Sequence, residues 1–148
     1  MKKIIFLMFV FPVVLIGCMQ PVQSPIAGAW EMVAGKWVSL DSTRIYEFPG
    51  NLEGNQICIY SDKYYLFSGR FKLDTAPDFS DNYGGGIYAY DGEKYEENLM
   101  FFPDPETIGK TLAYDLVING DTLIKTGPID VTEDMFWGTL REVYVRKD

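Results

Sequence analysis

The chain contains no histidine. This absence excludes catalysis by Ser-His-Asp and Cys-His arrangements and removes the ligand used in most zinc sites. Carboxylates are numerous, but no pair of them stands at the spacing of a recognisable acid–base site. The composition therefore predicts a protein that is not an enzyme and has no catalytic residue.

Two segments have compositions typical of calcium or phosphate sites, but neither has the residue spacing that such sites need. Residues 74–82, DTAPDFSDN, are dense in oxygen ligands, but EF-hand spacing is absent and Pro77 and Phe79 interrupt the run. Residues 82–88, NYGGGIY, are glycine-rich, but no Lys and no helix follow as in a phosphate loop. We expect an exposed loop in the first case and a bulge or sharp bend in the second, with no metal and no cofactor.

Cysteine is scarce, with residues only at positions 18 and 58. Cys18 ends a leader in which Lys2 and Lys3 precede an uncharged apolar run at residues 4–16, too short to span a bilayer comfortably. Its last four residues, LIGC, resemble the lipobox of bacterial lipoproteins, where the chain is cut before Cys and the Cys is acylated. The resemblance implies a signal peptide at residues 1–17 and fatty acyl chains such as palmitate on Cys18. The alternative is an ordinary signal peptide with a chance Cys.

A lipid anchor would place the protein in the bacterial cell envelope. Several buried methylenes, at ~0.8 kcal/mol each, would hold an acylated Cys18 firmly in a membrane. Residues 18–24 would be a tether, and they lack the acidic cluster that some bacteria use for surface export. We therefore expect the outer membrane and a domain facing the periplasm. Cys58, in QICIY, would then have no disulfide partner and is expected to be a small buried hydrophobe.

Basic residues are also few. The chain has 13 Lys and Arg against 21 Asp and Glu, and loss of Lys2 and Lys3 with the leader takes the net charge from −8 to −10. Such an acidic surface is a poor partner for nucleic acid and for anionic lipid head groups. We expect a monomer that reaches the membrane only through its lipid anchor.

Amphipathic helical periodicity is nearly absent, and the best candidate is one short turn at residues 131–136. Aromatic residues make up 16% of the chain, and short segments rich in Tyr, Phe and Ile are joined by tight turns, which indicates antiparallel strands. The segments from residue 25 to 148 predict one all-β domain, either a sandwich or an antiparallel up-and-down barrel of about eight to ten strands. The expected strands are 29–34, 36–40, 44–48, 56–60, 64–73, 86–90, 94–102, 111–118, 121–126 and 139–146.

Two hairpin signals and the strand period of two assign the inward faces. Asp91-Gly92 and Asn119-Gly120 suit two-residue type I′ turns. These turns would pair Tyr88 with Tyr95 and Leu116 with Leu123. Glu97 falls on the apolar face, where a carboxylate is costly unless it has a partner, either an internal hydrogen-bond network or a ligand. The predicted interior set is Tyr65, Phe67, Tyr88, Tyr95, Glu97, Leu99, Tyr114 and Leu116.

Gly28-Ala29-Trp30, at the entry to the first strand, resembles the Gly-x-Trp signature of lipocalins and related calycins. The order of the later motifs resembles the lipocalin-like domains of small bacterial lipoproteins over nearly all of residues 25–148. The resemblance implies that Gly28 and Trp30 close one end of the barrel and that a basic residue near the last strand, Arg146 or else Arg141, packs on the Trp ring. The chain departs from such domains by Tyr144, where they tend to have Trp, and by an extra segment at residues 34–49 that would add a hairpin or lid. The later motifs that carry this resemblance are SDKYYLF at 61–67, YGGGIYAYDGEKYEE at 83–97, IGKTL at 108–112, NGDTL at 119–123 and EVYVR at 142–146.

Two functional hypotheses remain. A barrel of about eight strands has room for packed side chains or for one small ligand. The first hypothesis is a tethered protein that binds a small apolar or amphipathic molecule. An interior void above roughly 300 Å³ would favour it. The second is a non-catalytic interaction or structural module of the cell envelope with a solid barrel core. An exposed apolar patch would favour it.

Overall fold

The computed structural model of the chain describes residues 24–131 and 136–147. The expected signal peptide, Cys18 and nearly all of the tether lie outside the described residues. So does the middle of the helical turn expected at residues 131–136, whose two end residues belong to strands. In the described ranges no helix has the length and apolar character needed to cross a membrane.

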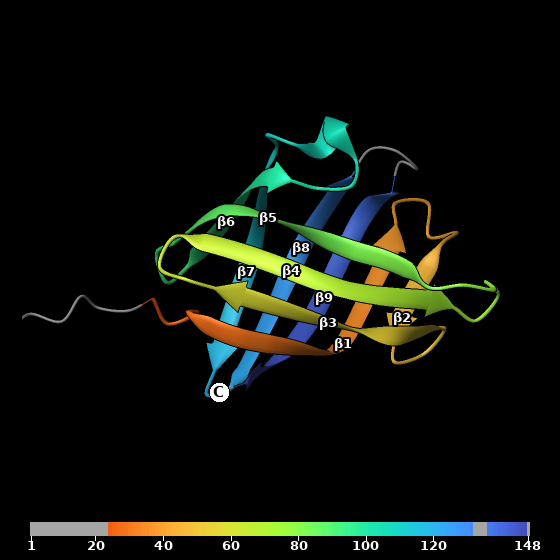
Figure 1. Cartoon of the computed structure of the whole chain (residues 1–148), viewed down its shortest axis with the longest axis horizontal. Helices are drawn as coiled ribbons and strands as arrows, with labels where there is room; N and C mark the ends of the chain where they lie inside the picture. The colour runs from red at the N-terminus through yellow and green to blue at the C-terminus, as the bar shows by residue number, and fades with distance from the viewer. Residues whose placement is uncertain (1–23, 132–135, 148) are drawn as a thin grey trace, which may run out of the picture.

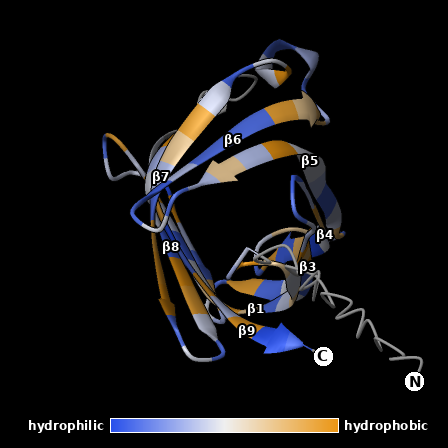
Figure 2. Ribbon diagram, turned by 90° about the vertical axis from the view of Figure 1, so that its left-hand side faces the viewer, coloured by the Kyte–Doolittle hydropathy of each residue, from blue (hydrophilic) through white to orange (hydrophobic). Residues whose placement is uncertain are grey.

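The fold is a closed antiparallel barrel (Figure 1). The hydrogen-bonded order is β2-β1-β3-β4-β5-β6-β7-β8-β9, and β1 also pairs with β9, which closes eight strands into a ring and leaves β2 as an addition. Figure 2 shows this ring, with β1 between β3 and β9. The predicted all-β up-and-down barrel is confirmed, and the only helical element of the described part is the 3-10 turn η1 (Pro105–Thr107). The strands are β1 (Gly28–Ser39), β2 (Ile45–Phe48), β3 (Leu52–Tyr60), β4 (Tyr64–Leu73), β5 (Ser80–Tyr90), β6 (Lys94–Phe101), β7 (Thr111–Asn119), β8 (Thr122–Val131) and β9 (Phe136–Lys147).

The first strand corrects one expectation and confirms another. Residues 29–34 and 36–40 were expected as separate strands, but β1 is continuous and pairs with β9 along nearly its whole length. A register shift between Met32 and Ala34 absorbs the irregularity without ending the strand. Residues 34–49 add the expected hairpin, because β2 folds back on the second half of β1 and pairs Trp37 with Tyr46.

Both hairpin turns lie one residue later than predicted. Tyr90 pairs with Tyr95, so Tyr88 lies opposite Glu97 and not opposite Tyr95. Likewise Leu116 lies opposite Lys125 and not opposite Leu123. The central pairs are Gly92-Glu93 and Gly120-Asp121, with positive φ only at the glycine, as in type II′ turns. Because each register differs by two residues, every side chain keeps its predicted face.

The glycine run at residues 84–86 forms the expected irregularity. The register of β5 against β6 shifts between Gly85 and Gly86. A Cβ at Gly86 would meet the backbone oxygen of Asn98 at 1.9 Å, so any side chain there would force the two strands apart. Because these glycines have no side chains, β5 can bend tightly against β4 and β6, and the bend shapes this part of the barrel wall.

Candidate functional site

One end of the barrel is closed by Trp30. Its side chain is fully buried, and its indole Nε1 donates to the carbonyl of Ile26 at 2.8 Å. The guanidinium of Arg146 lies 4.1 Å from the ring centroid and donates to the carbonyls of Ala27 and Pro25. Gly28 has φ +123°, and a Cβ there would stand 3.0 Å from Arg146 Nη1. The predicted burial of Trp30 and the predicted packing of Arg146 on its ring are confirmed.

Above Trp30 the barrel is packed with tyrosines. Tyr60 contacts the rings of Tyr65, Tyr88 and Tyr95 at centroid distances of 6.2, 5.4 and 6.2 Å. The hydroxyl of Tyr65 is buried and has no hydrogen-bond partner within the described residues. Of the predicted interior set, Tyr65, Tyr95 and Leu116 are buried and Tyr88 is half-buried against them. They point inward as predicted, but they fill this end of the barrel and are not among the residues that line the interior cavity described below.

A charged cluster crosses the barrel at mid-height. Lys125 Nζ lies 3.0 Å from Glu142 Oε2 and 3.4 Å from Glu97 Oε1, and all three side chains are buried. Tyr95 and Tyr144 each donate a hydroxyl to these carboxylates at 2.8 Å, to Glu97 Oε1 and to Glu142 Oε2 respectively. The prediction that Glu97 points inward is therefore confirmed, and its partners are an ammonium and a tyrosine hydroxyl.

The network extends across the barrel to β1, β3 and β5. Trp37 Nε1 donates to Glu142 Oε1 at 3.2 Å. Gln56 donates to the Tyr144 hydroxyl at 2.8 Å and accepts from Asn82 at 2.6 Å. Tyr144 supplies an oxygen that the Trp expected from the family resemblance would lack, so this departure serves the polar network.

The cluster shifts the pKa values of its members. Burial alone would lower the pKa of Lys125, but the negative charges of Glu142 and Glu97 outweigh it and hold that pKa well above its ordinary value. Burial, and next the charge of Glu97, raise the pKa of Tyr95 and that of Tyr114 above their ordinary value. Burial raises the pKa of the free thiol of Cys58 to about 12. Lys125 is thus charged and the thiol neutral at pH 7, so neither is an activated nucleophile.

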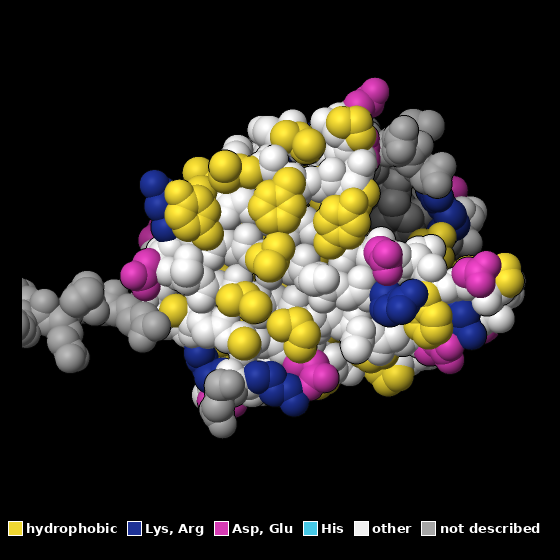
Figure 3. All heavy atoms as spheres, viewed as in Figure 1, with side chains coloured by type: hydrophobic (Ala, Val, Ile, Leu, Met, Phe, Trp, Pro, Cys, Tyr) yellow, Lys and Arg dark blue, Asp and Glu magenta, His cyan; other side chains and the backbone are white. Residues whose placement is uncertain are grey.

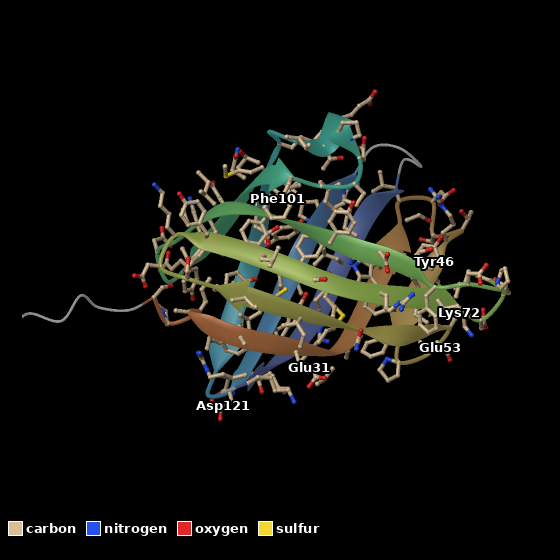
Figure 4. The ribbon with its side chains drawn as sticks, in the orientation of Figure 1. Glu31, Tyr46, Glu53, Lys72, Phe101 and Asp121 are labelled. Atoms are coloured by element: carbon tan, nitrogen blue, oxygen red, sulfur yellow. The ribbon has the colours of Figure 1, made fainter. Side chains whose placement is uncertain are left out.

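A cavity of about 240 Å³ opens on the other side of the charged cluster, away from Trp30. Four members of the predicted set line it, namely Phe67, Glu97, Leu99 and Tyr114. The remaining lining residues were not predicted, and they come from β1, β3, β5, β7, β8 and β9, from the residue that follows β6, and from β2, which contributes Tyr46 (Figure 4). They are Trp37, Tyr46, Gln56, Asn82, Phe102, Leu112, Lys125, Ile129, Leu140 and Glu142.

The inward positions of Lys125 and Glu142, which were not predicted, could have been predicted from the sequence. Lys125 has the same strand parity as the buried Leu123, and Glu142 has the same parity as the buried Leu140 and Tyr144. Their inward positions therefore follow from period two alone. Among the described residues no three His, Cys, Asp or Glu side chains converge so as to hold a metal ion.

The outer wall carries an exposed apolar patch. Hydrophobic side chains gather over β3–β6 on the face shown in Figure 3. Phe101, at the end of β6, projects from this wall (Figure 4). The patch comprises Ile59, Tyr64, Leu66, Met100 and Phe101, which border one shallow groove.

Comparison of the chain with protein-family models, with curated proteins and with solved structures gives no match. The barrel is compatible with a lipocalin-like fold, and the geometry of its interior is the basis for inferring function.

Proposed function

We propose that this protein is a membrane-anchored, lipocalin-like lipoprotein that binds a small apolar or amphipathic molecule inside its barrel and catalyses no reaction. The observation that carries the proposal is the cavity of about 240 Å³ between apolar walls and a buried polar floor. Binding sites for small molecules combine these two features, with the walls supplying affinity and a few polar groups fixing orientation.

The size of the cavity limits the ligand. Pockets for drug-sized molecules begin at about 300 Å³, whereas an apolar cavity of about 150 Å³ holds benzene. At about 240 Å³ the interior fits a molecule between these limits. The cavity is smaller than the roughly 300 Å³ stated above as favouring a ligand-binding protein, so it supports only a small ligand, and the exposed patch over β3–β6 keeps the interaction module as the alternative.

Filling the cavity tests this proposal. Leu112 lines the cavity, whereas Val117, on the same strand, is 58% exposed on the outer wall. We expect the purified wild-type protein to bind fluorobenzene, a small apolar probe, in fluorine NMR titrations. Leu112→Trp should abolish binding and Val117→Trp should leave it unchanged. Phe67→Ala, which widens the cavity, should change the affinity. Equal binding by Leu112→Trp and wild type would show that the probe does not occupy the barrel.

The proposed anchor has a separate test. Cys18→Ser removes the only candidate for acylation, so we expect the variant to accumulate as unprocessed precursor or to leave the membrane fraction. Cys58→Ser, at the chain's other cysteine, is the matched control and should fractionate like wild type. A Cys18→Ser protein that matures normally and still sediments with the outer membrane would refute the lipoprotein assignment. The proposed location facing the periplasm depends on the same result.

A further inference from the structure

The charged floor of the cavity has one carboxylate oxygen without a partner. Glu97 Oε1 accepts from Tyr95 and contacts Lys125, whereas Glu97 Oε2 makes no hydrogen bond or ion pair within the described residues. The unpaired hydroxyl of Tyr65 lies near this carboxylate. Glu97 is 3% exposed and lines the cavity. Among the described residues the Tyr65 hydroxyl is the only fully buried side-chain polar atom without a partner, so Glu97 Oε2 is accessible from the cavity. This oxygen therefore marks a position where a bound molecule would supply the missing donor.

The other members of the cluster are fully engaged. Glu142 accepts from Trp37 on Oε1 and from Lys125 and Tyr144 on Oε2. Lys125 lies between the two carboxylates, with its ammonium 4.8 Å from the centroid of the Tyr114 ring. Two carboxylates therefore share one ammonium. No second Lys or Arg is among the residues that line the cavity, so the ionised cluster has one negative charge in excess.

From this geometry, and resting on the proposed function, we propose that the ligand is a small organic amine, bound as its ammonium ion with the nitrogen donating to Glu97 Oε2. The ammonium offsets the excess charge and provides the donor that this oxygen lacks. The apolar body of the amine packs against Leu99, Leu112 and Leu140. By the benzene comparison, the cavity holds roughly ten non-hydrogen atoms.

Two other ligand classes fit less well. A metal ion needs several converging ligands, and among the described residues no such group of His, Cys, Asp or Glu exists. A carboxylate would bring a second uncompensated negative charge beside Glu97 and Glu142. A neutral alcohol could donate to Glu97 Oε2 but would leave the excess charge in place, so it should bind more weakly than an amine of the same shape.

Three probes of nearly equal shape test the proposal, namely 2-phenylethylamine, 2-phenylethanol and phenylacetate, each titrated calorimetrically into the purified protein at pH 7. We expect the amine to bind about 10- to 100-fold more tightly than the alcohol, the range expected for a hydrogen bond to a charged group. Phenylacetate should not bind measurably. This order is measured on the unmodified protein and so does not depend on the folding of any variant.

Glu97→Gln then assigns the preference to one carboxylate. We expect it to remove at least tenfold of the amine's advantage while 2-phenylethanol still binds. Glu96→Gln, which removes the same charge from the exposed outer face of β6, should preserve the advantage. Equal affinities for amine and alcohol, or equal effects of the two substitutions, would overturn the amine assignment and leave a cavity that binds apolar molecules. Binding of none of the three probes, nor of fluorobenzene, would instead contradict the proposed function itself.

Discussion

Lys125→Met is expected to lower the free energy of unfolding at pH 7 by about 3–5 kcal/mol, the cost typical of removing one partner from a buried ion pair. Methionine approximates the length of the lysine stem but supplies no charge and no donor. Glu97 and Glu142 would then lie buried without the ammonium that now contacts both. Chemical denaturation followed by circular dichroism measures the effect.

The matched control is Lys147→Met, which removes an ion pair between Lys147 and Glu31 whose side chains are 50% and 36% exposed. Exposed pairs contribute about 0–1 kcal/mol, so this variant should unfold nearly like wild type. A loss below about 1 kcal/mol for Lys125→Met would contradict the assignment of Lys125 as the cation that compensates the cluster.

Lys125→Met should also change how the stability of the fold depends on pH. Because the folded state raises the pKa of Lys125, its charge stabilises the fold fully below the unfolded pKa of about 10.4, and this contribution is lost as pH rises towards the folded pKa. The buried tyrosines, including Tyr95 and Tyr114, have raised pKa values and contribute with the same sign above about pH 10. Wild-type stability should therefore fall above about pH 10, and Lys125→Met should fall less steeply.

Trp30→Ala is expected to cost about 3–5 kcal/mol, the range for truncation of a fully buried Trp. The substitution empties the closed end of the barrel, removes the donor to Ile26 and takes away the ring that contacts Arg146. Val33→Ala, on the same strand and 41% exposed, is the control and should change stability by less than about 0.5 kcal/mol. If the two variants unfold alike, Trp30 does not close the barrel.

The period of the strands predicts the interior faces well. In the two tight hairpins the turn lies one residue later than the dipeptide signal indicates, which changes the cross-strand partners of Tyr88 and Leu116. The faces survive because the register error is two residues, the period of a strand. For the same reason Glu97 could be placed inside the barrel from parity alone.

Parity does not report height along the barrel axis, which is why only part of the predicted interior set lines the cavity. Tyr65, Tyr95 and Leu116 have inward parity but lie towards Trp30 in the packed half, whereas Leu99 and Phe67 lie beside the cavity. Height depends on the register of all the strands together, including the bulges near Met32 and Gly85. Single-strand patterns do not contain that information.

The most direct test of the central claim is native mass spectrometry of the protein purified from its own cell envelope, followed by organic extraction and identification of the released molecules. The account predicts one non-covalent small molecule, an amine, that is absent from Leu112→Trp and present in Val117→Trp. The acyl chains of Cys18 would remain attached under denaturing conditions and so be distinguished from it. Wild-type protein that carries no such molecule and also fails to bind fluorobenzene would contradict the account and leave the apolar patch over β3–β6 as the functional surface.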